Sequence, residues 1–198
     1  MTGTAGAGDV PWSRGRWTHP PLAAREDGAD LVVTAAEGSD AWRHTSYGFV
    51  HDSEHGLVAP LPTGHAVEVT FTAAFERQFD QAGVLLRTSA ERWIKAGVEF
   101  ADGVPQLGAV VTDGRSDWSV APVPSWAGRR VTVRASRAGD AVTIRARVDG
   151  EPFRLVRLAP WAPDAQVEAG PFCCAPTRAG LAVRFHGWQV TDADGALH

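Results

Sequence analysis

The chain is built from short runs in which apolar and polar residues alternate, and this pattern constrains its fold more than any other feature. Runs such as AVEVTFTAAF (66–75) and AVTIRARV (141–148) place every second side chain on one face, as a β-strand does. Glycine, proline and aspartate separate the runs, and no sustained 3.6-residue helical pattern is present. The sequence therefore predicts an all-β fold, a two-sheet antiparallel β-sandwich.

Strand-like runs cover most of the chain, and its 198 residues suit a single domain. Residues 1–25 are rich in Gly, Pro and Trp and are expected to form an irregular N-terminal cover. The tail, 192–198, is expected to fray. The predicted strands are 29–35, 47–51, 66–75, 81–87, 93–100, 105–112, 117–121, 129–136, 141–148, 153–157, 167–173 and 180–190.

Charge and composition argue against several classes of function. The net charge is −4 with both signs interspersed, which disfavours nucleic-acid and anionic membrane partners. No apolar run approaches the ~20 residues of a membrane span, and MTGTAGAGDVPW lacks the pattern of a secretory signal. Cys173 and Cys174 are adjacent, so they would point to opposite faces of a strand and are expected to be buried thiols. We therefore expect a cytoplasmic protein.

Three consecutive antiparallel strands are predicted between residues 81 and 112. Asp102-Gly103 lies between two alternating runs, which is the strongest short hairpin signal, and a two-residue loop there places Glu99 opposite Gln106. A five-residue loop at 88–92 fixes the register of the remaining strand. One face is then the predicted core face, which carries Ala82, Val84, Leu86, Ile94, Ala96, Val98, Phe100, Leu107, Ala109 and Val111.

The opposite face of these strands carries the candidate ligand site. A row of glycines, Gly83, Gly97 and Gly108, crosses it, and glycine inside a strand often marks close approach of a backbone or a ligand. Polar and aromatic side chains border the row, which suits a polyhydroxylated ligand such as a sugar. The alternative is a trough filled by a loop of the same chain. The candidate ligand-binding residues are Trp42, His44, Tyr47, Gln81, Arg87, Trp93, Lys95, Glu99, Gln106 and Trp118.

Lys95 is the only lysine in the chain, beside eighteen arginines. A lysine ammonium is compact, whereas arginine is a broad planar fork, so a retained lysine marks a position where arginine does not serve. Ile94 and Ala96 fall on the core face, so the ammonium of Lys95 is expected to point into the trough. There it would reach Glu99 or a ligand, with a role in recognition rather than in folding.

No catalytic, cofactor or metal-binding pattern is evident in the sequence. It contains no nucleophilic triad order, phosphate loop or nucleotide fingerprint, so we assign no catalytic residue and no cofactor. HDSEH (51–55) has the spacing of a helical metal pair but no third ligand in register, and a solvated loop is expected there. Glu99 and Asp117 are the carboxylates placed near the trough. A glycosidase needs a pair about 5–9.5 Å apart, and the sequence does not establish that spacing.

Several ordered segments resemble a known family over roughly residues 12–190. It is the regulation-of-enolase-like domain of unknown function, in the concanavalin A-like lectin/glucanase superfamily. The resemblance implies a jelly roll with one concave sheet and supplies no catalytic residues. Phe79 and Gly108 depart from the family pattern, which tends to have Tyr and Ser there. The segments are WRHTSYGF (42–49), FDQAGVLLR (79–87), WIKAGVEFADG (93–103), GAVVTDGRSDWSV (108–120) and EAGPFCCAP (168–176).

Three functions fit this predicted face. The first, and our hypothesis, is a module that binds a carbohydrate or a small polar metabolite. The second is a glycan or glycoside hydrolase, which a second carboxylate facing Glu99 would favour. The third is a regulatory protein-interaction domain, which an exposed apolar patch would favour.

Overall fold

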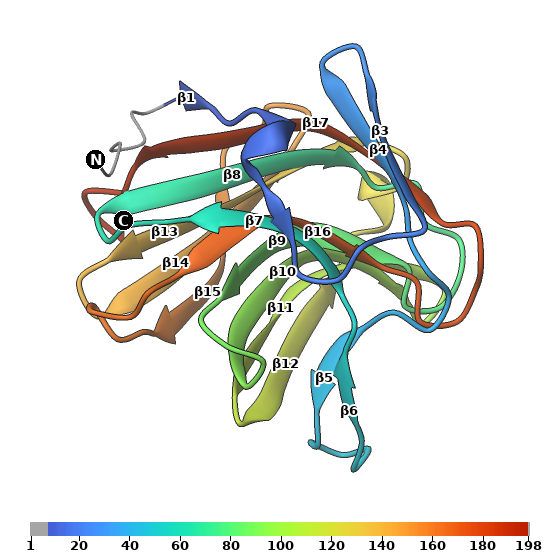
Figure 1. Cartoon of the computed structure of the whole chain (residues 1–198), viewed down its shortest axis with the longest axis horizontal. Helices are drawn as coiled ribbons and strands as arrows, with labels where there is room; N and C mark the ends of the chain where they lie inside the picture. Colours follow the sequence, from blue (N-terminus) through green and yellow to red (C-terminus); the bar gives the residue numbers. More distant parts are fainter. Residues whose placement is uncertain (1–7, 198) are drawn as a thin grey trace.

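Two antiparallel β-sheets pack face to face in the computed structural model, which describes residues 8–197 (Figure 1). The larger sheet has the order β15-β14-β13-β8-β17-β4-β3, with β1 also paired to β17, and the second has the order β12-β11-β10-β9-β16-β7-β2. Two short 3₁₀ helices are the helices of the described residues, and none of them is long and apolar enough to span a membrane. The predicted all-β sandwich is confirmed.

The strands of the larger sheet are β1 (Gly8–Asp9), β3 (Ala23–Asp27), β4 (Asp30–Thr34), β8 (His65–Thr72), β13 (Arg130–Ala138), β14 (Ala141–Val148), β15 (Arg154–Pro160) and β17 (Ala182–Asp192). Those of the second sheet are β2 (Arg16–Trp17), β7 (His55–Pro60), β9 (Gln81–Arg87), β10 (Arg92–Ala101), β11 (Val104–Asp113), β12 (Arg115–Pro122) and β16 (Glu168–Cys174). A separate hairpin pairs β5 (Ala41–Arg43) with β6 (Val50–Asp52), and the 3₁₀ helices are η1 (Trp12–Arg14) and η2 (Pro124–Trp126).

The main hydrophobic core lies between the two sheets because each strand sends alternate side chains inward. In β14, for example, Val142 and Ile144 are fully buried, whereas Thr143 between them is only half-buried. The predicted core face of β9, β10 and β11 is confirmed, since all ten of its residues lie in this core or pack against it.

The predicted register of β9, β10 and β11 is also confirmed. Glu99 lies opposite Gln106, and Gly97 lies opposite both Gly83 and Gly108. Asp102 and its neighbouring glycine have φ angles of 53° and 80°, the positive values that a two-residue type I′ turn requires.

Within the described residues the N-terminal cover is not irregular throughout, and fraying of the tail stays a prediction. The segment 8–25 contributes β1, β2 and the start of β3 to sheet edges, while residues 1–7 lie outside the described range. In the tail, the carboxylate of Asp194 pairs with Arg134 and Arg145, and Arg145 also donates to the carbonyl of Leu197 at 2.7 Å. Residue 198 lies outside the described range.

The predicted solvated loop at HDSEH was also wrong. His51 lies in β6, and His55 begins β7, a strand that the sequence pattern did not predict. Residues 55–58 are all buried, so the strand lacks the alternation that marks a half-buried strand. The His55 ring is structural, since its Nε2 accepts a hydrogen bond of 3.0 Å from the backbone N–H of Ala36.

A smaller apolar cluster, here called the hairpin cluster, lies on the outer face of the second sheet beneath β5 and β6. Cys174 belongs to this cluster, whereas Cys173 belongs to the main core, so the adjacent thiols point to opposite faces and are both free and buried, as predicted. The members of the hairpin cluster are Ala41, Trp42, Val58, Leu85, Trp93, Val110, Phe172 and Cys174.

Candidate functional site

An open pocket of about 330 Å³, here called the hairpin pocket, lies between the second sheet and the β5–β6 hairpin. Its acidic residues are Asp40 and Glu99, and Lys95 also lines it. Figure 1 shows the hairpin projecting beside β12, below the strands of the second sheet in this view. The remaining lining residues are the aromatic residues Trp42, Tyr47, Phe49, Phe79 and Trp118, together with Gly38, His51, Val110, Pro176 and Thr177.

The ammonium of Lys95 points into this pocket, but its partner is Asp40 rather than Glu99. The Nζ atom lies 2.7 Å from Oδ1 of Asp40, and the lysine side chain is buried. Burial acts to lower the pKa of Lys95, but the charges of nearby acidic groups, Asp40 first, together raise it. Lys95 therefore also ties the hairpin to the sheet, a structural role that the sequence-based prediction omitted.

Glu99 brings a second carboxyl group to the pocket in a different environment. Its Oε1 atom is buried and has no hydrogen-bond partner among residues 8–197. Burial raises the pKa of Glu99 to about 7, the charge of Lys95 opposes this rise, and the charge of Asp40 adds to it. Near neutral pH this carboxyl group therefore binds a proton far more readily than an ordinary glutamate.

The glycine row is not an open trough. Beside it lies a recess of only about 20 Å³, and the row ends at Phe172 opposite Gly83 and at Val120 opposite Gly108. A Cβ on Gly97 would overlap the carbonyl oxygen of Ala82 and would lie 2.8 Å from the Cα of Gly83. Close approach of neighbouring strands therefore explains these glycines, and the open space lies beside them, under the hairpin.

Several other predicted site residues also line the pocket. Trp42 and Trp118 meet edge to face with ring centroids 6.3 Å apart, and Tyr47 stacks on Phe49 at 5.3 Å. Gln81 lines the small neighbouring recess instead, and it donates from Nε2 to the carbonyl of Phe79 at 3.1 Å and to Asp40 at 3.4 Å.

Besides Gln81, four predicted residues do not line this pocket. Trp93 is buried in the hairpin cluster, and Gln106 donates to the carbonyl of Ala101 within its own hairpin at 3.3 Å. His44 occupies the tight β5–β6 turn with a φ of 61°. Arg87 is engaged by carboxylates outside the pocket. Their placement depends on how loops cover the sheet, which the strand pattern does not encode.

The acidic partner of the site was also misassigned. Asp117 lies opposite Val111, a residue of the core face, and pairs with Arg157 at 2.7 Å. Asp40 takes its place in the pocket, although 55 positions separate it from Lys95 in the chain. No local pattern marks Asp40, because its role depends on a contact between a loop and a strand.

Phe79, which also lines the pocket, has an unusual backbone conformation. Its φ is 66°, a left-handed value that a bulky residue rarely adopts, and its carbonyl oxygen accepts the hydrogen bond from Gln81. Such outliers concentrate at functional sites. In the sequence, the signal for this position was that Phe79 departs from the family pattern, which tends to have Tyr there.

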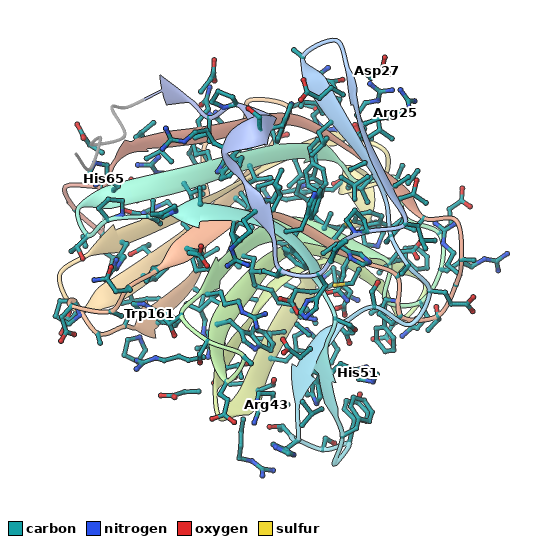
Figure 2. All side chains as sticks on the ribbon, in the orientation of Figure 1. Arg25, Asp27, Arg43, His51, His65 and Trp161 are labelled. Carbon is teal, nitrogen blue, oxygen red and sulfur yellow. The ribbon has the colours of Figure 1, made fainter. Side chains whose placement is uncertain are left out.

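Arg43 anchors the hairpin beside the pocket and is labelled in Figure 2. Its Nε atom donates to the carbonyl of Gly114 at 3.2 Å, its guanidinium pairs with Glu91 at 2.9 Å, and its backbone N–H donates to Ser116. With the Lys95 pair, these contacts fix the aromatic wall against the sheet.

One group in the described residues, His19, Asp52 and Glu54, has the spacing of metal ligands, with its donor atoms within 4.8 Å of one another. Arg87 already donates to both carboxylates, at 3.0 Å to Asp52 and 2.5 Å to Glu54. The Nδ1 atom of His19 lies 3.0 Å from the carbonyl of Glu54. The arrangement is therefore an ion network in which arginine supplies the positive charge.

Comparison with known proteins identifies the family of this fold. The family model described as a protein of unknown function, DUF1349, matches residues 17–193. The chain belongs to the DUF1349 family. The resemblance noted in the sequence is thereby confirmed, and membership assigns no activity.

Individual relatives agree with this assignment. A Saccharomyces cerevisiae protein named Regulation of enolase protein 1 is 35% identical over 187 residues, covering 94% of each chain. The crystal structure of a functionally unknown protein from the same yeast has a TM-score of 0.88 at 33% identity, covering 94% of this chain and 100% of that one. A GH43 protein from Bacillus licheniformis has a TM-score of 0.70 at 13% identity, covering 93% of this chain and 38% of that one, which shows the fold alone.

Proposed function

We propose that the protein binds a small polyhydroxylated ligand, such as a sugar of one or two rings, in the hairpin pocket. The observation that carries this proposal is the combination of buried polar groups and aromatic walls in one open pocket. Aromatic faces pack against the C–H faces of a sugar ring, while Asp40, Lys95 and Glu99 offer acceptors and donors for its hydroxyl groups. A volume of about 330 Å³ lies near the lower limit for ligand pockets, which favours a small ligand.

The comparisons are compatible with this proposal but do not select a ligand. The GH43 protein shares only the fold with this chain. One yeast relative is named for regulation of enolase, and the yeast crystal structure is described as that of a functionally unknown protein. The pocket chemistry of this chain therefore carries the argument.

The proposal is tested by calorimetric titration and saturation-transfer NMR with a panel of neutral mono- and disaccharides. We expect at least one sugar to bind, and Trp118→Ala to weaken that binding by about tenfold through loss of stacking. The control is Leu158→Ala, which removes a comparably exposed apolar side chain from the other sheet. Absence of binding across the panel, or equal affinity for Trp118→Ala and wild type, would contradict the proposal.

A second candidate function is protein binding through the tip of the β5–β6 hairpin. Tyr47, Phe49 and Val50 are exposed there, with 55%, 43% and 44% of their surfaces accessible. Exposed apolar patches are common at interaction sites, and the name of the yeast relative refers to regulation of enolase. Sedimentation of the protein with an enolase, repeated with Phe49→Ser, tests this function. A complex that Phe49→Ser weakens would support it, and the absence of a complex would argue against it.

A further inference from the structure

Two carboxyl groups in the hairpin pocket have opposite environments. All three hydrogen bonds to the carboxylate of Asp40 reach Oδ1, from Lys95 Nζ at 2.7 Å, from the backbone N–H of Ala41 at 2.8 Å and from Gln81 Nε2 at 3.4 Å. The Oδ2 atom accepts no hydrogen bond from residues 8–197, and the side chain is partly accessible. Three donors thus engage Oδ1 of Asp40, while Oδ2 stays free to accept a proton.

Glu99 has the complementary properties of a proton donor. Neither of its side-chain oxygens accepts a hydrogen bond within the described residues, and Oε1 is completely buried. Burial raises its pKa to about 7, so a large fraction carries a proton at neutral pH. An acid that is easily protonated, placed in one pocket with a second carboxylate that can accept a proton, is the usual arrangement of a general acid and a general base.

We propose that Glu99 and Asp40 act as general acid and general base in the hydrolysis of a small glycoside bound in the hairpin pocket. This inference rests on the proposed function, because the substrate must occupy the same pocket as the sugar. Lys95 acts as a positioning residue that holds Asp40. Asp40 supplies a second carboxylate in the same pocket as Glu99, from a different position than the sequence predicted.

The chemical step needs no cofactor and conserves every atom. Glu99 donates its proton to the glycosidic oxygen as the bond from that oxygen to the anomeric carbon breaks. A water oxygen forms the new bond to the anomeric carbon, and its proton passes to Oδ2 of Asp40. The products are the free sugar and the released alcohol, and solvent returns the proton from Asp40 to Glu99.

Other reactive side chains near the pocket do not fit a nucleophilic role. The ammonium of Lys95 is paired with Asp40, and its pKa is raised, so it stays protonated. Cys174 is fully buried, and burial raises its thiol pKa well above the ordinary value. The two carboxyl groups are the acidic side chains that line the pocket.

The test uses a panel of 4-nitrophenyl α- and β-glycosides of common hexoses and pentoses. Release of 4-nitrophenol measures turnover, and calorimetric titration of the same glycosides into Glu99→Gln measures binding separately. We expect turnover of at least one glycoside that binds, and a fall in its rate above about pH 7 as Glu99 loses its proton. Glu99→Gln and Asp40→Asn should each lower kcat by about 100-fold or more with KM changed less than about threefold. Because His51 also lines the pocket, the pH profile is repeated with His51→Gln.

The control is Glu168→Gln, which changes an exposed carboxylate on β16 that pairs with Arg16 away from the pocket, and it should leave turnover unchanged. Glycosides that bind without being cleaved, or a Glu99→Gln variant with wild-type turnover, would overturn the acid–base proposal and leave the binding function intact. Failure of every glycoside and sugar to bind would overturn both proposals together.

Discussion

Replacing Lys95 with methionine tests whether the Asp40–Lys95 pair holds the hairpin on the sheet. The two side chains are 5% and 20% exposed, so the substitution leaves a largely desolvated carboxylate with the weaker donors of Ala41 and Gln81. Removing one partner of a buried ion pair costs about 3–5 kcal/mol. Because part of Asp40 reaches solvent, we expect a loss of about 2–3 kcal/mol in the free energy of unfolding.

Urea denaturation at pH 7 and calorimetry measure this loss. For a domain of this size, the expected destabilisation lowers the melting temperature by about 5–10 °C. The double variant Lys95→Met/Asp40→Leu should regain most of the stability, because no unpaired charge remains. The matched control, Arg178→Met, breaks the pair with buried Asp80 and should cost stability without changing sugar binding. A loss below about 1 kcal/mol for Lys95→Met, or a double variant no more stable than the single one, would refute the reasoning.

Three further predictions follow from the same surroundings. Glu99 has a pKa of about 7 in the folded protein against an ordinary value of 4.5, so the wild type loses stability as pH rises between these values. In urea denaturation, the free energy of unfolding of Glu99→Gln should therefore equal that of the wild type near pH 4 and exceed it by about 3 kcal/mol at pH 8. A difference in stability that does not depend on pH would contradict the raised pKa. Gly97→Ala should destabilise the fold by about 1–3 kcal/mol, because the added methyl overlaps the carbonyl of Ala82, and unchanged thermal unfolding would show that the strands can separate there. Cys173 and Cys174 should react with a thiol reagent only after unfolding, two per chain, since burial raises the pKa of Cys173 to about 12 and both thiols are free, and fewer than two would indicate a disulfide.

The sequence alone determined the three-stranded segment that carries much of the site. Alternation assigned the core face of β9, β10 and β11, and the turn at Asp102-Gly103 fixed the register, because both signals arise from neighbouring residues. The same reasoning placed Lys95 and Glu99 on the outer face. It did not find β7, because a strand buried on both faces loses its alternation.

Only the tertiary structure decided which groups meet on that outer face. The β5–β6 hairpin brings Asp40 to Lys95, covers Trp93 and pairs Arg87 with its own Asp52 outside the pocket. Because of the hairpin, the open pocket lies beside Glu99 and not over the glycine row. The physical reason is that strand periodicity is local, whereas the path of a loop depends on the sum of many distant contacts. A sequence pattern can therefore place a residue on a face, but the packing of the whole chain determines its partner.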